Sequence, residues 1–264
     1  MTEEGSGAPA IEFRGVHKSF AGRAALDGLT LAVGPGETVA LVGPSGCGKT
    51  TALRLVNRLL EADAGSVRVF GRDVREEDPV GLRRRIGYVI QEGGLFPHWS
   101  VANNIEIVPR LLGWTPQRRR ARSEELLAMV NLPYGEFAGR SPRELSGGQR
   151  QRVGVARALA GDPSLVLMDE PFGALDPIAR RALQREFSGW KSRIGKAVLL
   201  VTHDLEEAFR LADRVAVMQA GRIRQVGARS EILDRPADDF VREFTAGNLD
   251  PGERPSGRGN PRPA

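Results

Sequence analysis

The sequence predicts an α/β protein with a mostly parallel sheet, an antiparallel β portion and an inserted helical subdomain. From Ile11 onward, short apolar segments typical of strands alternate with segments typical of helices. Strand signals stop between about residues 92 and 161 and resume with SLVLMDE. The alternation is typical of parallel strands covered by helices, and the interruption indicates an insertion into that core.

The expected elements follow from apolar runs and helical patterns. Strands are predicted, in chain order, at IEFRGV, TLAV, ETVALVG, SVRVF, RIGYVIQ, SLVLMDE, AVLLVTH, RVAVMQ and RIRQVG. A helix is expected from Lys49 to about Leu60, another across RRRARSEELLAMVNL in the insertion, and a third from near Asp204.

These elements divide the chain into a flexible N-terminus (1–10), one domain (11–244) and a tail (245–264). Within the domain, the core is expected over about 11–91 and 162–244, and the helical subdomain over about 92–161. The tail is rich in Pro, Gly and Arg, and we predict that it is disordered because this composition cannot build a core.

Composition excludes several classes of protein. No apolar run approaches the roughly 20 residues of a membrane span, and the N-terminus lacks the basic start and apolar core of a secretory signal. The single Cys47 excludes an internal disulfide and a multi-cysteine metal site. The net charge of +5 lies largely in arginines of solvated helices and the tail, so no nucleic acid partner is expected. We therefore expect a cytoplasmic protein that reaches a membrane only through a partner.

The segment GPSGCGKT joins a predicted strand to a predicted helix. Its glycines let the backbone curl so that N–H groups face phosphate oxygens, and the helix N-terminus adds partial positive charge. Lys49 can reach the β- and γ-phosphates, and the Thr50 hydroxyl can ligate Mg²⁺. A glycine-rich turn closing a βα unit is the alternative, but the spacing favours a nucleotide site. The predicted nucleotide-binding residues here are Gly43, Pro44, Ser45, Gly46, Cys47, Gly48, Lys49, Thr50 and Thr51.

Two carboxylates follow the apolar run LVLM. A buried strand would deliver Asp169 and Glu170 to the sheet edge where the phosphate loop also lies. Asp169 suits a direct or water-mediated Mg²⁺ contact, and Glu170 can orient and polarise an attacking water. A strand that ends at an acidic turn is the alternative, and the phosphate loop favours the catalytic interpretation.

A second glycine motif, LSGGQ, precedes a predicted helix. Ser146 offers a hydroxyl, Gly147 and Gly148 let a phosphate approach the backbone, and Gln149 completes the motif at the helix N-terminus. The alternative is an ordinary Ser N-cap. Two phosphate-binding surfaces with one nucleotide pocket predict that a second copy of the chain completes the site.

With these motifs placed, the chain resembles the ATP-binding subunits of ABC transporters from about Ile11 to Phe244. The resemblance implies that two ATP molecules, with Mg²⁺, are held between two head-to-tail subunits. It also implies an adenine-stacking role for Phe20, a contact to Mg²⁺ or water and to the membrane partner for Gln91, and a γ-phosphate contact for His203. Asp176, which ends FGALD, is assigned to the nucleotide site. The implied catalytic residues are Glu170, His203, Gln91 and Lys49, and the implied metal ligands are Thr50, Gln91 and Asp169.

The segment YVIQEGGLFPHWSVANNI narrows the resemblance to importers of quaternary-amine osmoprotectants such as glycine betaine, choline and carnitine. Membrane permease subunits and, indirectly, an extracytoplasmic solute-binding protein are then implied, with the chain at the cytoplasmic face of the membrane. Many members carry a regulatory module after the ATPase domain, and none is expected here.

Other functions stay open at this point. They are an importer ATPase for an amino acid or polyamine, a soluble ABC ATPase acting on nucleic acid or ribosomes, and a P-loop kinase or GTPase. LSGGQ has no role in the last class.

Overall fold

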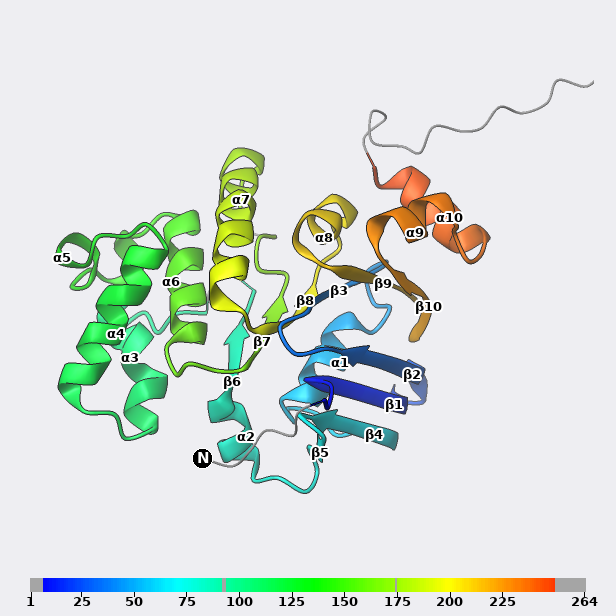
Figure 1. Ribbon diagram of the computed structural model, residues 1–264, viewed down its shortest axis with the longest axis horizontal. Coiled ribbons are helices and arrows are strands. Elements are labelled where there is room, and N and C mark those ends of the chain that lie inside the picture. The colour runs from blue at the N-terminus through cyan, green and yellow to red at the C-terminus, as the bar shows by residue number, and fades with distance from the viewer. Residues whose placement is uncertain (1–6, 92–93, 174, 250–264) are drawn as a thin grey trace, which may run out of the picture.

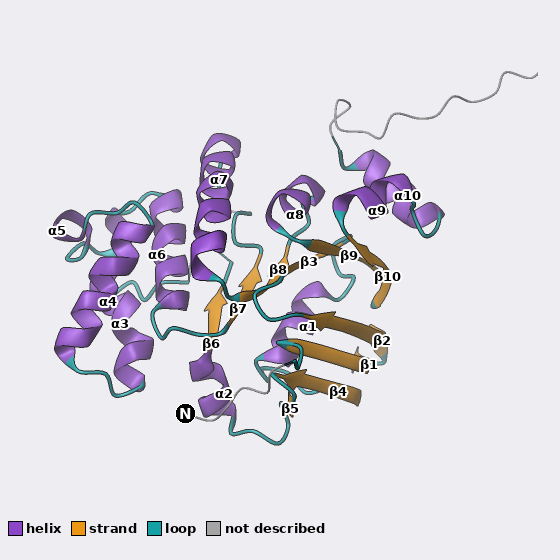
Figure 2. Cartoon of the chain, in the orientation of Figure 1, coloured by secondary structure: helices purple, strands orange, loops and turns teal. Residues whose placement is uncertain are grey.

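The computed structural model describes residues 7–91, 94–173 and 175–249 and contains two sheets (Figures 1 and 2). The larger sheet has the order β10-β9-β3-β8-β7-β6. Its strands are β3 (Thr38–Val42), β6 (Ile86–Val89), β7 (Leu165–Asp169), β8 (Ala197–Val201), β9 (Arg214–Gln219) and β10 (Arg222–Gly227). Only β10 runs antiparallel to its neighbour; every other pair in this sheet is parallel. The expected α/β class with an added antiparallel portion is confirmed.

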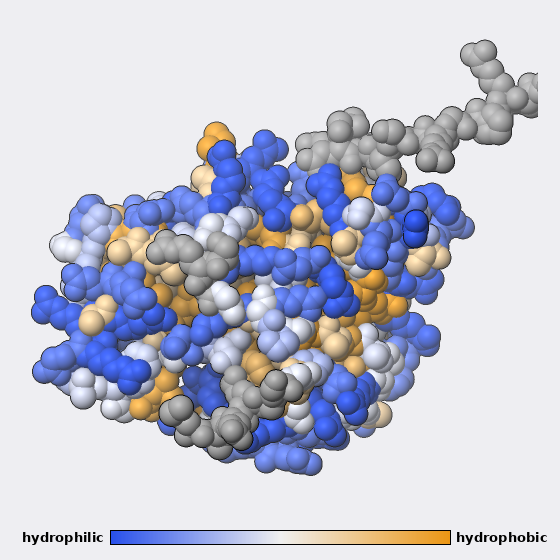
Figure 3. All heavy atoms as spheres, viewed as in Figure 1, coloured by the Kyte–Doolittle hydropathy of each residue, from blue (hydrophilic) through white to orange (hydrophobic). Residues whose placement is uncertain are grey.

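The central strand β3 separates two hydrophobic cores. Val39 and Leu41 pack in the core shared with α1 (Lys49–Val56) and the smaller sheet. Ala40 and Val42 pack in the opposite core, with the helical subdomain, α7 (Pro177–Ile194) and α8 (Leu205–Leu211). Alternate side chains of a strand point to opposite faces, so an uninterrupted apolar run is needed when both faces are covered. On the face in Figure 3, hydrophilic residues dominate the rim and apolar residues show mainly toward the middle.

The smaller sheet is antiparallel, with the order β2-β1-β4-β5. Its strands are β1 (Ile11–Phe20), β2 (Arg23–Val33), β4 (Ala64–Val69) and β5 (Arg72–Asp73). Strand β2 begins earlier than the expected TLAV segment because Ala21 and Gly22 both have positive φ, 46° and 79°, and form a tight hairpin turn. The hairpin carries Phe20 to its tip, where the residue is 46% exposed.

The inserted segment is helical. It contains α3 (Val101–Leu111), α4 (Pro116–Met129), α5 (Tyr134–Phe137), the 3₁₀ helix η1 (Pro142–Glu144) and α6 (Gly147–Leu159), which lie together at the left of Figure 1. Helix α4 begins before the expected Arg118 because the Thr115 hydroxyl caps it and proline is compatible with the first helical turn. The short helix α2 (Pro79–Arg85) leads into β6.

Two expected boundaries are wrong. Helix α1 ends at Val56, not near Leu60, because Asn57 is its C-cap and Arg58 adopts φ 51°, which turns the chain. Structure also continues beyond 244: after α9 (Arg229–Asp234), helix α10 (Asp239–Gly247) passes that boundary, and Leu249 is buried in the core.

The remaining predictions about the ends fall on 1–6 and 250–264, outside the described residues. Before Ile11, the backbone N–H of Ala10 already donates to Val33 O at 2.8 Å, so pairing with β2 starts within the segment expected to be flexible. No helix among the described residues combines the length and apolar character needed to cross a membrane.

Candidate nucleotide site

The phosphate loop lies between the end of β3 and the start of α1. Three of its glycines have positive φ: Gly43 at 151°, Gly46 at 79° and Gly48 at 106°. A Cβ atom on Gly43 would lie 2.2 Å from Met218 O, and one on Gly48 would lie 2.3 Å from Ala25 O. The loop backbone is therefore pressed against two neighbouring segments, and these two positions exclude any larger residue.

We expect Gly48→Ala to destabilise the protein by more than about 2 kcal/mol, because it combines a left-handed φ with a backbone clash. Gly46→Ala is the matched control: its φ is also positive, but nothing lies within 4 Å of the added Cβ. We expect this control to cost about 1 kcal/mol. Urea unfolding of both variants measures the difference, and equal losses would show that the contact with Ala25 does not constrain the loop.

Lys49 is buried at the first position of α1. Its Nζ donates to Gly43 O at 2.7 Å and to Pro44 O at 3.0 Å, so the loop's own carbonyls hold the ammonium inside the curl. Cys47 is also buried, and burial raises the pKa of its thiol. A protonated thiol is a poor nucleophile, so Cys47 is a small buried residue of the loop and not a reactive thiol.

Strand β7 brings Asp169 to the phosphate loop. The Thr50 hydroxyl donates to Asp169 Oδ1 at 2.9 Å, although the two residues are far apart in the sequence. Burial raises the pKa of Asp169, and the hydrogen bond from Thr50 partly offsets that effect. A hydroxyl and a carboxylate in contact at a sheet edge are an oxygen donor set of the kind that Mg²⁺ prefers, so these residues fit the expected ion.

Glu170 stands at the meeting point of three strand ends. Its Oε2 lies 3.3 Å from His203 Nδ1, beyond β8, and 3.5 Å from Gln91 Nε2, beyond β6. Its backbone has φ 45°, rare for a residue other than glycine, while its N–H donates to Val201 O at 2.9 Å. A strained backbone held by its neighbours is common at functional sites. The structure thus brings together Glu170, His203 and Gln91 at one sheet edge.

The LSGGQ segment forms a capped helix start. Gln149 N donates to Ser146 Oγ at 3.2 Å, and Ser146 N donates to Gln149 Oε1 at 2.9 Å, a reciprocal capping box. Ser146 is exposed to solvent. Among the described residues, no hydrogen bond or ion pair joins this segment to the phosphate loop of the same chain.

Comparisons with known proteins identify the family. Residues 26–173 match the protein family described as ABC transporter. The chain belongs to the ABC transporter family.

Several ABC proteins show how close the similarity is. The choline transport ATP-binding protein OpuBA of Bacillus subtilis is 49% identical over 89% of this chain and 61% of its own length. The glycine betaine uptake system ATP-binding protein YehX of Escherichia coli is 49% identical over 89% of this chain and 76% of its own length. The sulfate/thiosulfate import ATP-binding protein CysA 2 of Chromobacterium violaceum is 48% identical over 91% of this chain and 65% of its own length.

Among solved structures, a dimeric ATP-binding cassette in a post-hydrolysis state with ADP and Pi has a TM-score of 0.73 and 31% identity. The match covers 83% of this chain and 98% of that one.

The sequence also assigned Phe20 and Asp176 to the nucleotide site. The Phe20 ring is exposed, and Lys18 Nζ lies 5.5 Å from its centroid. Asp176 is the N-cap of α7, and its Oδ1 accepts from Ile178 N at 3.1 Å and from Ala179 N at 3.0 Å. The sequence assigned Asp176 to nucleotide binding, and the structure adds a capping function that fixes the start of α7.

Sequence reasoning missed Tyr88 and Arg54. Burial raises the pKa of the Tyr88 phenol, and the charge of Asp169 raises it further. Arg54 interacts with both Tyr88 and Asp169. Arg54 lies four residues after Thr50 on α1, so helical spacing alone could have placed it on the same face. The charged neighbourhood of Asp169 is therefore larger than the motifs indicate.

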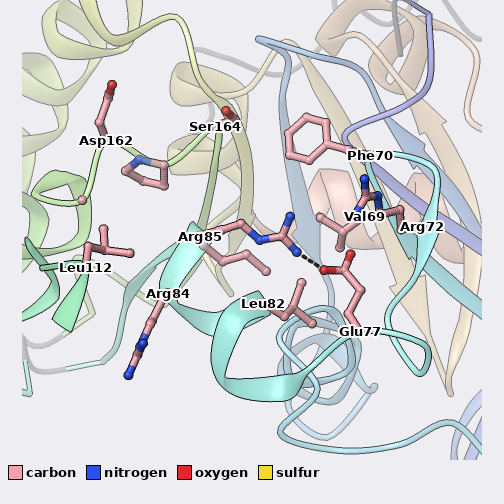
Figure 4. Close-up of a pocket in the computed structure, with 13 residues that line it drawn as sticks. Val69, Phe70, Arg72, Glu77, Leu82, Arg84, Arg85, Leu112, Asp162 and Ser164 are labelled. Carbon is pink, nitrogen blue, oxygen red and sulfur yellow. Dashed lines mark hydrogen bonds and ion pairs between the residues drawn. The ribbon is translucent and has the colours of Figure 1, made fainter. Parts of the chain in front are cut away.

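A separate hollow of about 370 Å³ lies away from these residues (Figure 4). Its lining includes Ile86 and Ser164, near the amino ends of β6 and β7, whereas Asp169 ends β7 at its carboxyl end. An ion pair between Arg85 and Glu77 crosses it. Ligands of open α/β sheets bind beyond the carboxyl ends of the strands, so this hollow lies at the wrong end of β6 and β7 for the expected nucleotide.

Proposed function

We propose that the chain is the ATP-hydrolysing subunit of an importer for quaternary-amine osmoprotectants. The observation that supports hydrolysis most directly is Glu170, which has His203 and Gln91 within 3.5 Å at the edge shared with Thr50 and Asp169. The names of OpuBA and YehX, together with the segment around Gln91, support the choice of solute. The sulfate/thiosulfate import protein CysA 2 is almost as similar in sequence to this chain as OpuBA and YehX are. The experiment on the solute therefore has to include other solutes.

Each residue has a defined task in this proposal. The backbone N–H groups of the curled loop and the Lys49 ammonium bind the phosphates of ATP. Thr50, Asp169 and Gln91 would hold Mg²⁺, which neutralises charge on the β- and γ-phosphate oxygens when bound. Glu170 orients the attacking water and accepts its proton, while His203 contacts the γ-phosphate. Phe20 supplies an exposed ring for the adenine.

A second copy of the chain completes the site in this proposal. The N-terminus of α6 carries partial positive charge and the exposed Ser146. No hydrogen bond or ion pair among the described residues joins this segment to the phosphate loop of its own chain, and the related cassette is dimeric. The residues contributed by the partner are Ser146, Gly147, Gly148 and Gln149, with Asp176 nearby. Membrane permease subunits bind the dimer at the cytoplasmic face of the membrane, and a solute-binding protein acts through them.

Mixing two inactive variants tests the shared site. Lys49→Ala removes a phosphate contact, and Ser146→Asp keeps an N-cap residue while placing a negative charge against the phosphate. Each variant alone should lose hydrolysis. An equal mixture should recover about a quarter of the wild-type rate, because half of the dimers are mixed and each has one intact site. If mixed dimers form but ATP hydrolysis does not recover, both motifs belong to a site within one chain.

The solute is tested by measuring ATP hydrolysis in a bilayer that contains this chain with its permease and solute-binding protein. We expect glycine betaine, choline or carnitine to stimulate ATP hydrolysis severalfold, and sulfate, amino acids and polyamines to have no effect. Stimulation by one of the other solutes would support the importer function and assign it a different substrate.

Purification of the chain from cells tests the importer function itself. Recovery of the chain with ribosomes or DNA, and without a permease, would contradict that function.

A further inference from the structure

The buried carboxyl of Glu207 connects helix α8 to helix α7. Helix α8 begins two residues after His203, and α7 begins directly after Asp176. Glu207 on α8 is 3% exposed, and Gln184 on α7 is 4% exposed. Gln184 Nε2 donates to Glu207 Oε2 at 2.9 Å. Figure 1 shows the two helices on the same side of the larger sheet, and this hydrogen bond fixes one against the other.

The charged groups around Glu207 are engaged elsewhere. Arg180 on α7 lies 3.9 Å from Asp204 Oδ2, and Arg210 on α8 donates to Gln184 Oε1 at 3.3 Å. Within the described part of the chain, no hydrogen bond of good geometry reaches Glu207 Oε1, although the Thr202 hydroxyl is close enough to lower the pKa of Glu207. The charged residues that line the small hollow at this junction are Arg180, Arg181, Asp204, Glu206, Glu207 and Arg210. Glu207 is therefore a buried acid whose contact to α7 is made by an amide and not by a cation.

Burial is the main reason that the pKa of Glu207 rises from 4.5 to about 7, and the negative charge of Asp204 adds to it. The carboxyl therefore gains and loses its proton around neutral pH. A hydrogen bond to an ionised acceptor is stronger than one to a neutral acceptor. The connection between α7 and α8 should accordingly strengthen as the pH rises through neutrality.

We propose that Glu207 is a positioning residue which, through Gln184, fixes α8, the helix that follows His203, against α7, the helix that follows Asp176. The inference rests on the proposed ATPase function. Glu207 acts through the first turn of α8, where its own N–H donates to Asp204 Oδ1 at 2.9 Å. Since the phosphate loop lies on other elements, loss of the connection alters turnover and leaves nucleotide binding largely intact.

The test compares the full-length chain with Glu207→Ala, Glu207→Gln and the control Glu206→Gln, which removes a charge from the next position. For Glu207→Ala we expect kcat to fall at least tenfold and the Kd for ATP to stay within about threefold, since small misplacements of catalytic groups are costly. Glu207→Gln keeps an acceptor for Gln184 and should retain about half of kcat or more. Between pH 6 and 8, kcat of the wild type should rise, whereas Glu207→Gln should lack that rise.

Unfolding experiments between pH 4.5 and 8 separate a folding defect from a positioning role. The raised pKa means that folded Glu207 holds its proton more tightly than the unfolded residue does. Wild-type stability should therefore decrease as the pH rises from about 4.5 toward 7 and level off above 7, and Glu207→Gln should lack this decrease. Wild-type kcat in Glu207→Ala, or an unchanged pH profile in Glu207→Gln, would overturn the positioning role. A wild-type chain that binds ATP without hydrolysing it would instead overturn the proposed function.

Discussion

Glu170→Gln should bind ATP with wild-type affinity and hydrolyse it at least about 100-fold more slowly. The amide keeps the size of the side chain and removes its ability to accept a proton. It also removes the negative charge that lies 3.3 Å from His203 Nδ1. The phosphate contacts come from Lys49 and the loop, so the Kd for ATP should change by less than about threefold. With ATP present, the variant should elute as a dimer because the nucleotide that joins the two subunits is not consumed.

The control for this variant is Glu125→Gln, which removes the same charge from a side chain that is 65% exposed on the helical subdomain. It should keep the wild-type rate and elution. Steady-state ATPase assays, nucleotide titration and size-exclusion chromatography with light scattering supply the three measurements. Normal turnover in Glu170→Gln would remove Glu170 from the catalytic role, and Asp169 or His203 would then have to be tested as the base.

Lys49→Ala should weaken ATP binding by about 100-fold, or roughly 3 kcal/mol. In the structure, the loop carbonyls of Gly43 and Pro44 already hold the ammonium inside the curl, 2.7 Å and 3.0 Å from Nζ. The charge is thus positioned where the phosphates would lie, and little side-chain ordering is left to occur on binding. Removing it leaves the backbone N–H groups of the loop without the ammonium charge inside the curl.

Lys196→Ala is the matched control, since this lysine pairs with Asp162 at 3.0 Å, away from the phosphate loop. It should leave the Kd for ATP unchanged. Calorimetric titration at fixed ionic strength measures both variants, and thermal unfolding shows whether each remains folded. Equal affinities of Lys49→Ala and wild type would contradict the assignment of GPSGCGKT as the phosphate loop.

Much of the fold was predictable because its requirements are local. An uninterrupted apolar run such as LVLM predicts a strand buried on both faces, and β7 is such a strand. The order of strands in the sheet was not predictable in the same way. Periodicity shows which face of a strand is buried, whereas the placement of β8 between β3 and β7 depends on how helices pack on the two faces. The predicted end of α1 was wrong because the single residue Arg58, with positive φ, turns the chain there. The predicted end of the domain at 244 was wrong because Leu249 is buried in the core.

The site divides in the same manner. The sequence by itself determined the phosphate loop, since a left-handed backbone at Gly43 and Gly48 is a local requirement that glycine meets. Only the tertiary structure decided that Gln91 and His203 converge on Glu170, because three strand ends must first become neighbours. It also decided that Glu207 is a buried acid on α8. The burial of Glu207 depends on the helices packed around it, and the local sequence around Glu206 and Glu207 does not show which helices those are.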